Sequence, residues 1–167
     1  MSHEPGTKRK RRGRLVSLSA FLVLCLAVSA VGGGVTATSV HGWYQTLNKP
    51  AFTPPDGVFA PVWIFLYLLM GVSAWIVWER ERGRKRRLAM ALFGVQLSLN
   101  LAWSFIFFGA RAVGWALIEL GFLWAAIAGT IYVFWQIDRL AGGLLVPYFL
   151  WVSFAGILNA AILSLNG

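Results

Sequence analysis

Aromatic side chains recur at helical spacing within the apolar stretch 58–78. Phe59, Trp63 and Tyr67 follow one another at intervals of four residues, and Met70 comes three residues later. This spacing places all four on one face of a helix with about 3.6 residues per turn. A face that carries three aromatic rings can stack against a flat, polarisable ligand.

A second apolar stretch, 88–108, carries side-chain amides on one face. Gln96, Asn100, Trp103 and Phe107 fall within about 60° of one another when each residue turns the helix by about 100°. An amide at the depth of the lipid is costly unless it is hydrogen-bonded. Two interpretations stay open, namely that the amides join neighbouring helices or that they line a ligand cavity together with Trp103.

A third stripe lies near the C-terminus. Its members share an arc of about 100° on the stretch 144–165, and they are Tyr148, Trp151, Ala155, Asn159 and Ile162. Together, the three faces could enclose a large, planar, apolar ligand and orient it with few hydrogen-bonding groups.

The sequence lacks the residue patterns that a metal site or hydrolytic catalysis would need. Cys25 is the single cysteine, and the two histidines, His3 and His41, do not form a zinc or haem-ligand spacing. Glu119 is the one ionisable residue well inside an apolar stretch, so no paired carboxylates are available for hydrolysis. We expect no metal, and we expect Glu119 either to have a function or to reach water or Arg111 near the headgroups.

Five apolar stretches must position these faces. Of the 167 residues, 58% are hydrophobic and 13% are charged, whereas about 25% are charged in a soluble domain. Five windows reach the roughly 20 residues that a membrane span needs, at about 15–40, 58–78, 88–108, 112–135 and 144–165. The sequence predicts an all-α membrane protein, a five-transmembrane-helix bundle in which residues 15–167 form a single domain and residues 1–14 form a disordered basic tail.

The basic residues predict the orientation. Of the 15 Lys and Arg residues, all but Lys49 and Arg111 lie in the tail, in the loop after the second span or at Arg139. The positive-inside rule then places the N-terminus in the cytoplasm and the C-terminus outside. We interpret the net charge of +9 as a collar that attracts anionic lipid headgroups, not as a nucleic-acid site. A cleavable signal peptide is the alternative interpretation of the first apolar run, and it is disfavoured because the run exceeds the usual length of about 7–15 residues.

The sequence also predicts two loops and one further helix face, which is made of small residues. Pro50, Pro54 and Pro55 stiffen a loop that would cover the first aromatic face, and residues 136–143 resemble another loop. Gly94, Ser98 and Ala102 form a stripe of small residues opposite the amides, typical of close helix contact. This stripe predicts a homodimer interface, with packing inside the same bundle as the alternative.

Three long motifs resemble one known family. WYQTLNKPAFTPP and the following VFAPVWIFLYLLMG are similar to the first loop and second helix of the tryptophan-rich sensory protein family, also called the translocator protein family. QLSLNLAWSFIFFG at 96–109 and AGGLLVPYFLWVSFAGILNAAILSLN at 141–166 resemble its third and fifth helices.

The resemblance implies a membrane receptor or sensor, in a bacterial cell membrane, with a role in tetrapyrrole homeostasis or stress signalling. Its ligands would be porphyrins, namely protoporphyrin IX and haem, and isoquinoline or benzodiazepine drugs, bound non-covalently beneath the first loop. The expected ligand-binding residues occupy motif positions: Trp43, Phe59, Trp63, Tyr67, Gln96, Asn100, Trp103, Trp151 and Ala155.

Two alternatives also follow from the resemblance. One is an enzyme that degrades porphyrin with light and oxygen, in which Trp43, Trp63, Trp103 and Trp151 are the candidate redox partners. The other is a transporter of porphyrin or sterol. A sterol role is disfavoured because the family's Leu/Val, Tyr, Lys/Arg cholesterol motif is missing from the C-terminal end.

Overall fold

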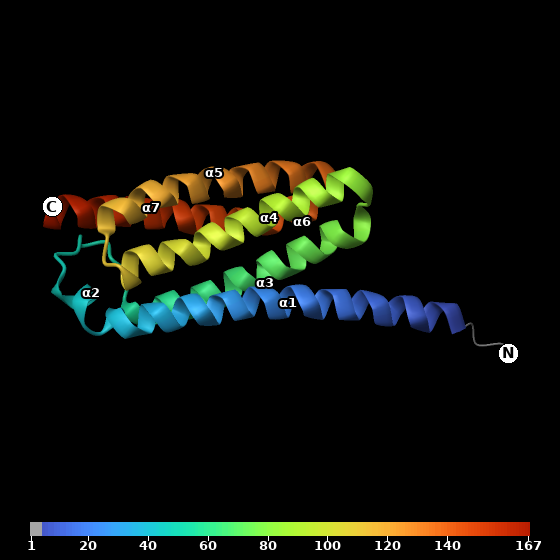
Figure 1. The fold of residues 1–167 in the computed structure, drawn as a ribbon, viewed down its shortest axis with the longest axis horizontal. Coiled ribbons are helices and arrows are strands. Elements are labelled where there is room, and N and C mark those ends of the chain that lie inside the picture. The colour runs from blue at the N-terminus through green and yellow to red at the C-terminus, as the bar shows by residue number, and fades with distance from the viewer. Residues whose placement is uncertain (1–4) are drawn as a thin grey trace.

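Five long helices lie side by side in one bundle (Figure 1). The structure is a computed structural model that describes residues 5–167, with side chains from residue 11 onward. The long helices are α1 (Pro5–Val40), α3 (Asp56–Arg80), α4 (Gly83–Ser104), α5 (Val113–Ile137) and α7 (Val146–Asn166). Short elements join them: α2 (Trp43–Thr46), the π-helical turn η1 (Phe105–Gly109) and α6 (Arg139–Leu144).

The predicted fold class is confirmed. All five spans are long and apolar enough to cross a membrane, and no strand occurs in residues 5–167. Helix α1 begins at Pro5 and so includes part of the basic segment 1–14, whereas residues 1–4 lie outside the described part. The disorder expected for this segment stays a prediction. Residues 139–144, expected within a loop, form α6 because the Asp138 carboxylate accepts a hydrogen bond from the Ala141 N–H and caps the helix.

The helices pack in two groups. Helix α1 runs along α3, and α5 packs against both α4 and α7, with α6 between α3 and α5. Glycine permits two of the closest approaches. A Cβ on Gly71 would stand 3.3 Å from the backbone of Leu22 in α1, and one on Gly142 would stand 2.9 Å from the backbone of Trp135. These contacts hold the bundle together at the end that carries the N-terminus.

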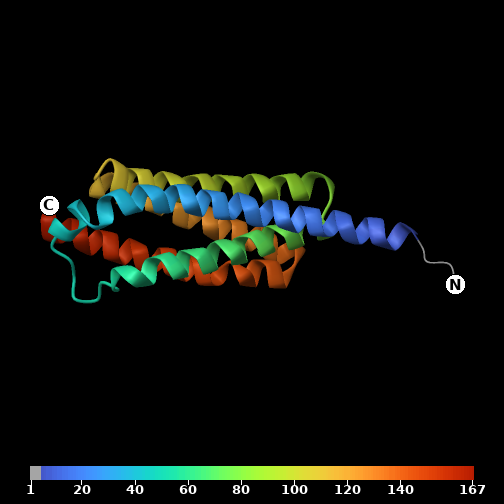
Figure 2. The same ribbon diagram turned by 90° about the horizontal axis from the view of Figure 1, so that it is seen from below.

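The two ends of the bundle differ in charge. Helix α2, the proline-rich loop and the C-terminus share one end, and the N-terminus and the α3–α4 connection share the other (Figures 1 and 2). The second end holds the basic runs and two ion pairs, Arg80 with Asp138 at 2.6 Å and Arg14 with Glu79 at 3.4 Å. The cavity described next lies toward the first end.

Candidate functional site

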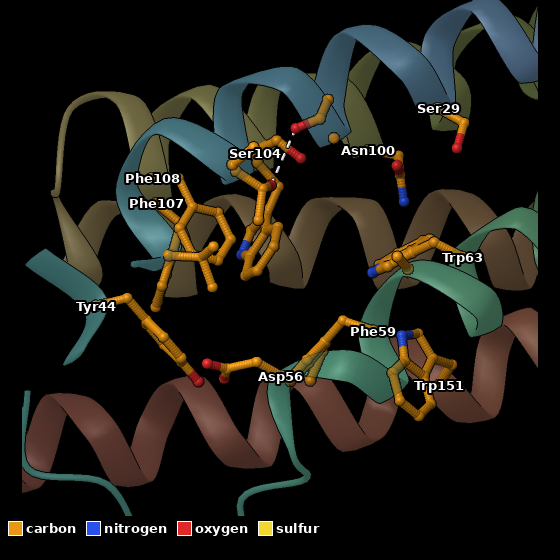
Figure 3. A pocket seen from close by; sticks show the side chains of 18 of the residues that line it. Ser29, Tyr44, Asp56, Phe59, Trp63, Asn100, Ser104, Phe107, Phe108 and Trp151 are labelled. Atoms are coloured by element: carbon orange, nitrogen blue, oxygen red, sulfur yellow. Dashed lines mark hydrogen bonds between the residues drawn. The ribbon is translucent and has the colours of Figure 1, made fainter. Parts of the chain in front are cut away.

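A cavity of about 590 Å³ lies inside the bundle beneath the first loop. Its walls come from α1, α2, α3, α4, η1 and α7 (Figure 3). Small-molecule sites commonly measure about 300–1,000 Å³ and are lined mainly by apolar side chains. The lining here follows that pattern, since aromatic and small aliphatic residues supply most of it.

Aromatic pairs hold the α3 and α7 walls together. Phe59 of α3 meets Trp151 of α7 edge to face, with ring centroids 6.0 Å apart, and Trp63 meets Tyr148 in the same way at 6.3 Å. On the opposite wall Trp103 stacks on Phe107 at 5.0 Å. Edge-to-face and stacked pairs contribute about 0.5–1.5 kcal/mol each beyond burial. The cavity therefore presents several ring faces in defined orientations.

A hydrogen-bonded chain of three side chains crosses the bundle at the deep end of the cavity. The Tyr67 hydroxyl donates to Oδ1 of Asn100, and Nδ2 of Asn100 donates to the Tyr148 hydroxyl at 2.9 Å. All three residues are buried. The amide of Asn100 thus both joins helices α3, α4 and α7 and forms part of the cavity lining, so the two interpretations of this amide hold together.

Two polar atoms of the lining have no partner within the described chain. Nε1 of Trp103 and Oδ1 of Asn159 are buried, and neither makes a hydrogen bond there. Asn159 is only 1% exposed, and its Nδ2 donates to the Val113 carbonyl at 3.4 Å. A buried polar group without a partner is costly. A bound molecule could therefore gain affinity by offering an acceptor to Trp103 or a donor to Asn159.

The mouth of the cavity is polar. Tyr44, His41 and Asp56 line it, and the burial of Tyr44, aided by the Asp56 carboxylate, raises the pKa of its phenol to about 12. Nζ of Lys49 lies 4.6 Å from the centre of the Tyr44 ring and donates to the Tyr44 carbonyl at 2.8 Å. The guanidinium of Arg111 stands over Trp43 at 6.0 Å. Lys49 thus lies against a residue of the mouth, and Arg111 lies against Trp43, which is outside the cavity lining.

The first loop is fastened over the cavity by a clasp, defined here as Asn48 and Asn166. The Asn48 N–H donates to Oδ1 of Asn166, and Nδ2 of Asn166 donates to the Asn48 carbonyl, both at 2.9 Å. Asn166 belongs to the last turn of α7. The loop between α2 and α3 is therefore tied to the far wall of the cavity.

Most of the predicted ligand-binding residues come together here. Those that line the cavity are Phe59, Trp63, Tyr67, Asn100, Trp103, Trp151 and Ala155. Trp43 and Gln96 do not line it. Trp43 packs edge to face on Phe107 at 5.8 Å, behind the wall, and the Gln96 amide points toward Sδ of Met70 at 3.9 Å.

The sequence reasoning missed the contribution of α1. Residues of this helix that line the cavity include Ser29, Gly32, Gly33 and Thr36. These small residues recur at helical spacing, but they carry no aromatic or amide side chain that would distinguish their face from the other small residues of this helix. The run of three glycines at 32–34 was the one local hint of a close approach.

The other two features singled out from the sequence lie outside the cavity. Gly94 and Ser98 are exposed on the outer face of α4 and Ala102 is half-buried, so the alternative of packing inside the bundle does not hold for the first two. The structure does not pair Glu119 with Arg111, and contact of Glu119 with water stays a prediction. Both carboxylate oxygens of Glu119 are buried without a partner in the described chain, and Arg111 faces Trp43 instead. Residues 5–167 contain no cluster of three or more potential metal ligands.

Comparison with known proteins identifies the family. The model of the TspO/MBR family matches residues 21–165. The chain is 38% identical over 154 residues to the tryptophan-rich protein TspO of Chlorobaculum tepidum, covering 92% of this chain and 98% of the relative. It is 40% identical over 139 residues to the human translocator protein, covering 80% and 82%, and 35% identical over 155 residues to protein CrtK of Rhodobacter capsulatus, covering 90% and 95%. With its five spans and its aromatic cavity, the chain belongs to the TspO/MBR family of integral membrane proteins.

Proposed function

We propose that this protein is a membrane receptor or sensor that binds porphyrins, namely protoporphyrin IX and haem, and takes part in tetrapyrrole homeostasis or stress signalling. The observation that carries the proposal is the cavity of about 590 Å³ with three indole rings, Trp63, Trp103 and Trp151, in its lining. A macrocycle offers broad π faces to these rings. Relatives named sensory protein and translocator protein agree with a general sensing or translocating role.

Two basic side chains near the first loop support a ligand with carboxylates, and they would have to outweigh the Asp56 carboxylate that lines the cavity itself. The two propionates of a porphyrin would lie at the polar end, where Lys49 and Arg111 flank Tyr44 and Trp43. The apolar ring would then occupy the aromatic interior. Flat, neutral drugs of the isoquinoline or benzodiazepine type would use the same walls without the charged groups.

A second function, oxidative degradation of porphyrin with light and oxygen, draws support from the same indoles. Trp63, Trp103 and Trp151 would touch the ligand directly and could exchange an electron with it, whereas Trp43 lies behind Phe107 and would act only through that ring. Binding without turnover and binding with turnover require the same cavity, so an experiment must separate them.

The test is a titration of purified protein with protoporphyrin IX, first in darkness and then under light. Trp fluorescence reports binding, and the porphyrin absorption band reports degradation. Quenching without loss of the absorption band favours the sensor. Bleaching that exceeds that of free porphyrin and falls in Trp63→Phe or Trp103→Phe favours the enzyme.

A matched pair on α7 tests the location of the site. Ala155 lines the cavity, and Ala160 lies on the exposed face of the same helix. Ala155→Leu should overfill the cavity and abolish binding, and Ala160→Leu should leave it unchanged. Trp151→Ala should weaken binding about tenfold, because it removes a ring and its buried area. Unchanged affinity in both Ala155→Leu and Trp151→Ala would exclude the cavity as the porphyrin site.

A further inference from the structure

Specific contacts hold three boundaries of the cavity. The α3–α7 edge is closed by the aromatic pairs of Phe59 with Trp151 and of Trp63 with Tyr148. The edge between α1 and α4 with η1 is closed by the Ser39 hydroxyl, which donates to the Phe108 carbonyl at 2.8 Å.

The same edge is closed again at Gly32, where a Cβ would stand 3.3 Å from Oγ of Ser104. At the loop end, beside the polar mouth, the clasp of Asn48 and Asn166 ties the loop to α7. A molecule that reaches the cavity along any of these three edges has to break contacts that the structure shows.

The fourth edge, between α1 and α3, is open along the half of the bundle near the loop. Figure 2 shows the two helices diverging toward the end that carries α2, with α7 visible between them. At the other end they touch, because Gly71 admits Leu22 and because Phe21 packs edge to face on Trp78 at 5.9 Å. Where the helices part, the cavity reaches the outside of the bundle between their facing sides.

The rim of this opening is apolar and small. On α1 it consists of Leu26, Ala30 and Gly33, and on α3 of Ala60 and Ile64, all of which line the cavity and are also exposed. None of these five carries a charge and all lie within the spans, whereas the exposed Asp56 at the start of α3 lines the cavity nearer the loop. A side chain at position 33 would meet open space, since no atom lies within 4 Å of a Cβ built there. Such a rim suits passage from lipid, where an apolar molecule already resides.

We propose that apolar ligands enter the cavity sideways from the bilayer, through this opening between α1 and α3, and that Gly33 and Ala60 keep it wide enough for a flat ring system. The buried and unpartnered Oδ1 of Asn159 inside the cavity is a second indication that a molecule is accommodated there. The choice of protoporphyrin IX as the ligand in the test below rests on the proposed function, but the proposed entry route between α1 and α3 does not.

Two adjacent glycines provide a matched pair. Gly33 and Gly34 are both exposed, and a Cβ at either position would have no atom within 4 Å, but Gly33 lines the cavity and Gly34 does not. Successive residues on a helix point about 100° apart. Leucine at position 33 should therefore obstruct the opening, and leucine at position 34 should point into lipid. Ala60→Leu obstructs the opening from the α3 side and serves as the independent second variant.

The first measurement is stopped-flow quenching of Trp fluorescence by protoporphyrin IX, with the protein in lipid nanodiscs. Gly33→Leu and Ala60→Leu should slow association by about tenfold and should also slow dissociation. Gly34→Leu should match the original protein. Weaker affinity with unchanged association rates would mean that Gly33 is only a ligand contact, and equal rates in Gly33→Leu and Gly34→Leu would equally overturn the route.

The second measurement does not need porphyrin. Ala155→Cys places a reporter thiol in the cavity lining, in a background where the buried native thiol is removed by Cys25→Ala. Alkylation by pyrenyl maleimide, a flat reagent that dissolves in the bilayer, should be slowed by Gly33→Leu and not by Gly34→Leu, while a charged, membrane-impermeant thiol reagent should react slowly throughout.

The two measurements separate the failure of each idea. Rapid reaction of the charged reagent would indicate entry from water through the loop end and would refute the lateral route. Slowed alkylation in Gly33→Leu, together with a failure of protoporphyrin IX to bind any variant, would refute the proposed function while leaving the route in place.

Discussion

Charge at the mouth of the cavity should discriminate between a porphyrin with free carboxylates and one without them. Lys49→Gln removes the ammonium group but keeps a polar side chain of similar reach. Lys49 is half-buried and sits against the Tyr44 ring, with Nζ also 3.4 Å from Oε1 of Gln45. Arg111 is exposed and adopts a positive φ of 57°, which is uncommon for a residue other than glycine.

The two charges should differ in effect because they differ in exposure. A unit charge pair about 6 Å apart interacts by about 0.7 kcal/mol in water and about 2.8 kcal/mol at an effective dielectric constant near 20. Exposed ion pairs are worth about 0.2–1 kcal/mol. We therefore expect Lys49→Gln to weaken protoporphyrin IX binding by about tenfold and Arg111→Gln by about two- to threefold.

Protoporphyrin IX dimethyl ester is the matched control ligand, because it keeps the macrocycle and loses both negative charges. Its affinity should be the same for the original protein, Lys49→Gln and Arg111→Gln. Raising the salt concentration should weaken the diacid and spare the diester. Equal losses for diacid and diester in Lys49→Gln would show that Lys49 acts by holding the loop through its bond to the Tyr44 carbonyl. No loss for either ligand would show that the propionates do not lie at the mouth.

Three other perturbations have defined outcomes. Asn100→Leu leaves the hydroxyls of Tyr67 and Tyr148 without their partner, so the free energy of unfolding in detergent should fall by about 2–4 kcal/mol. A loss below about 0.5 kcal/mol would mean that these side-chain hydrogen bonds do not stabilise the bundle. Ala102→Leu should shift the protein from dimer to monomer in light scattering without altering porphyrin affinity, and an unchanged mass would remove the α4 stripe as the dimer contact. A reporter fused after Gly167 should be active outside the cytoplasm and one in the α3–α4 connection active inside, and the reverse pattern would contradict the charge-based orientation.

Regular helical periodicity accounts for what could be predicted of the site. Phe59, Trp63 and Tyr67 lie on one face of α3, and Asn100 and Trp103 lie on the facing side of α4, as their spacing indicates. The five spans follow from hydropathy alone. Periodicity does not indicate which neighbouring helix or side chain each face contacts. The same face of α4 that turns Asn100 into the cavity turns Gln96 toward Met70, because the cavity ends between these two positions.

The π-helical turn η1, which follows Ser104, shows why another part of the cavity lining could not be predicted from the sequence. In η1 the Ala110 N–H donates to the Phe105 carbonyl at 2.7 Å, five residues back, so the turn contains an extra residue. Phe107 and Phe108 are consecutive, and both are buried and line the cavity, whereas a regular helix would turn the second about 100° away. Wide turns of this kind occur frequently at functional sites, and nothing in the spacing of residues 96–109 indicates where the wide turn begins. Angular reasoning at a constant 100° per residue therefore finds Phe107 and misses Phe108, and it fails where the backbone adapts to shape the cavity.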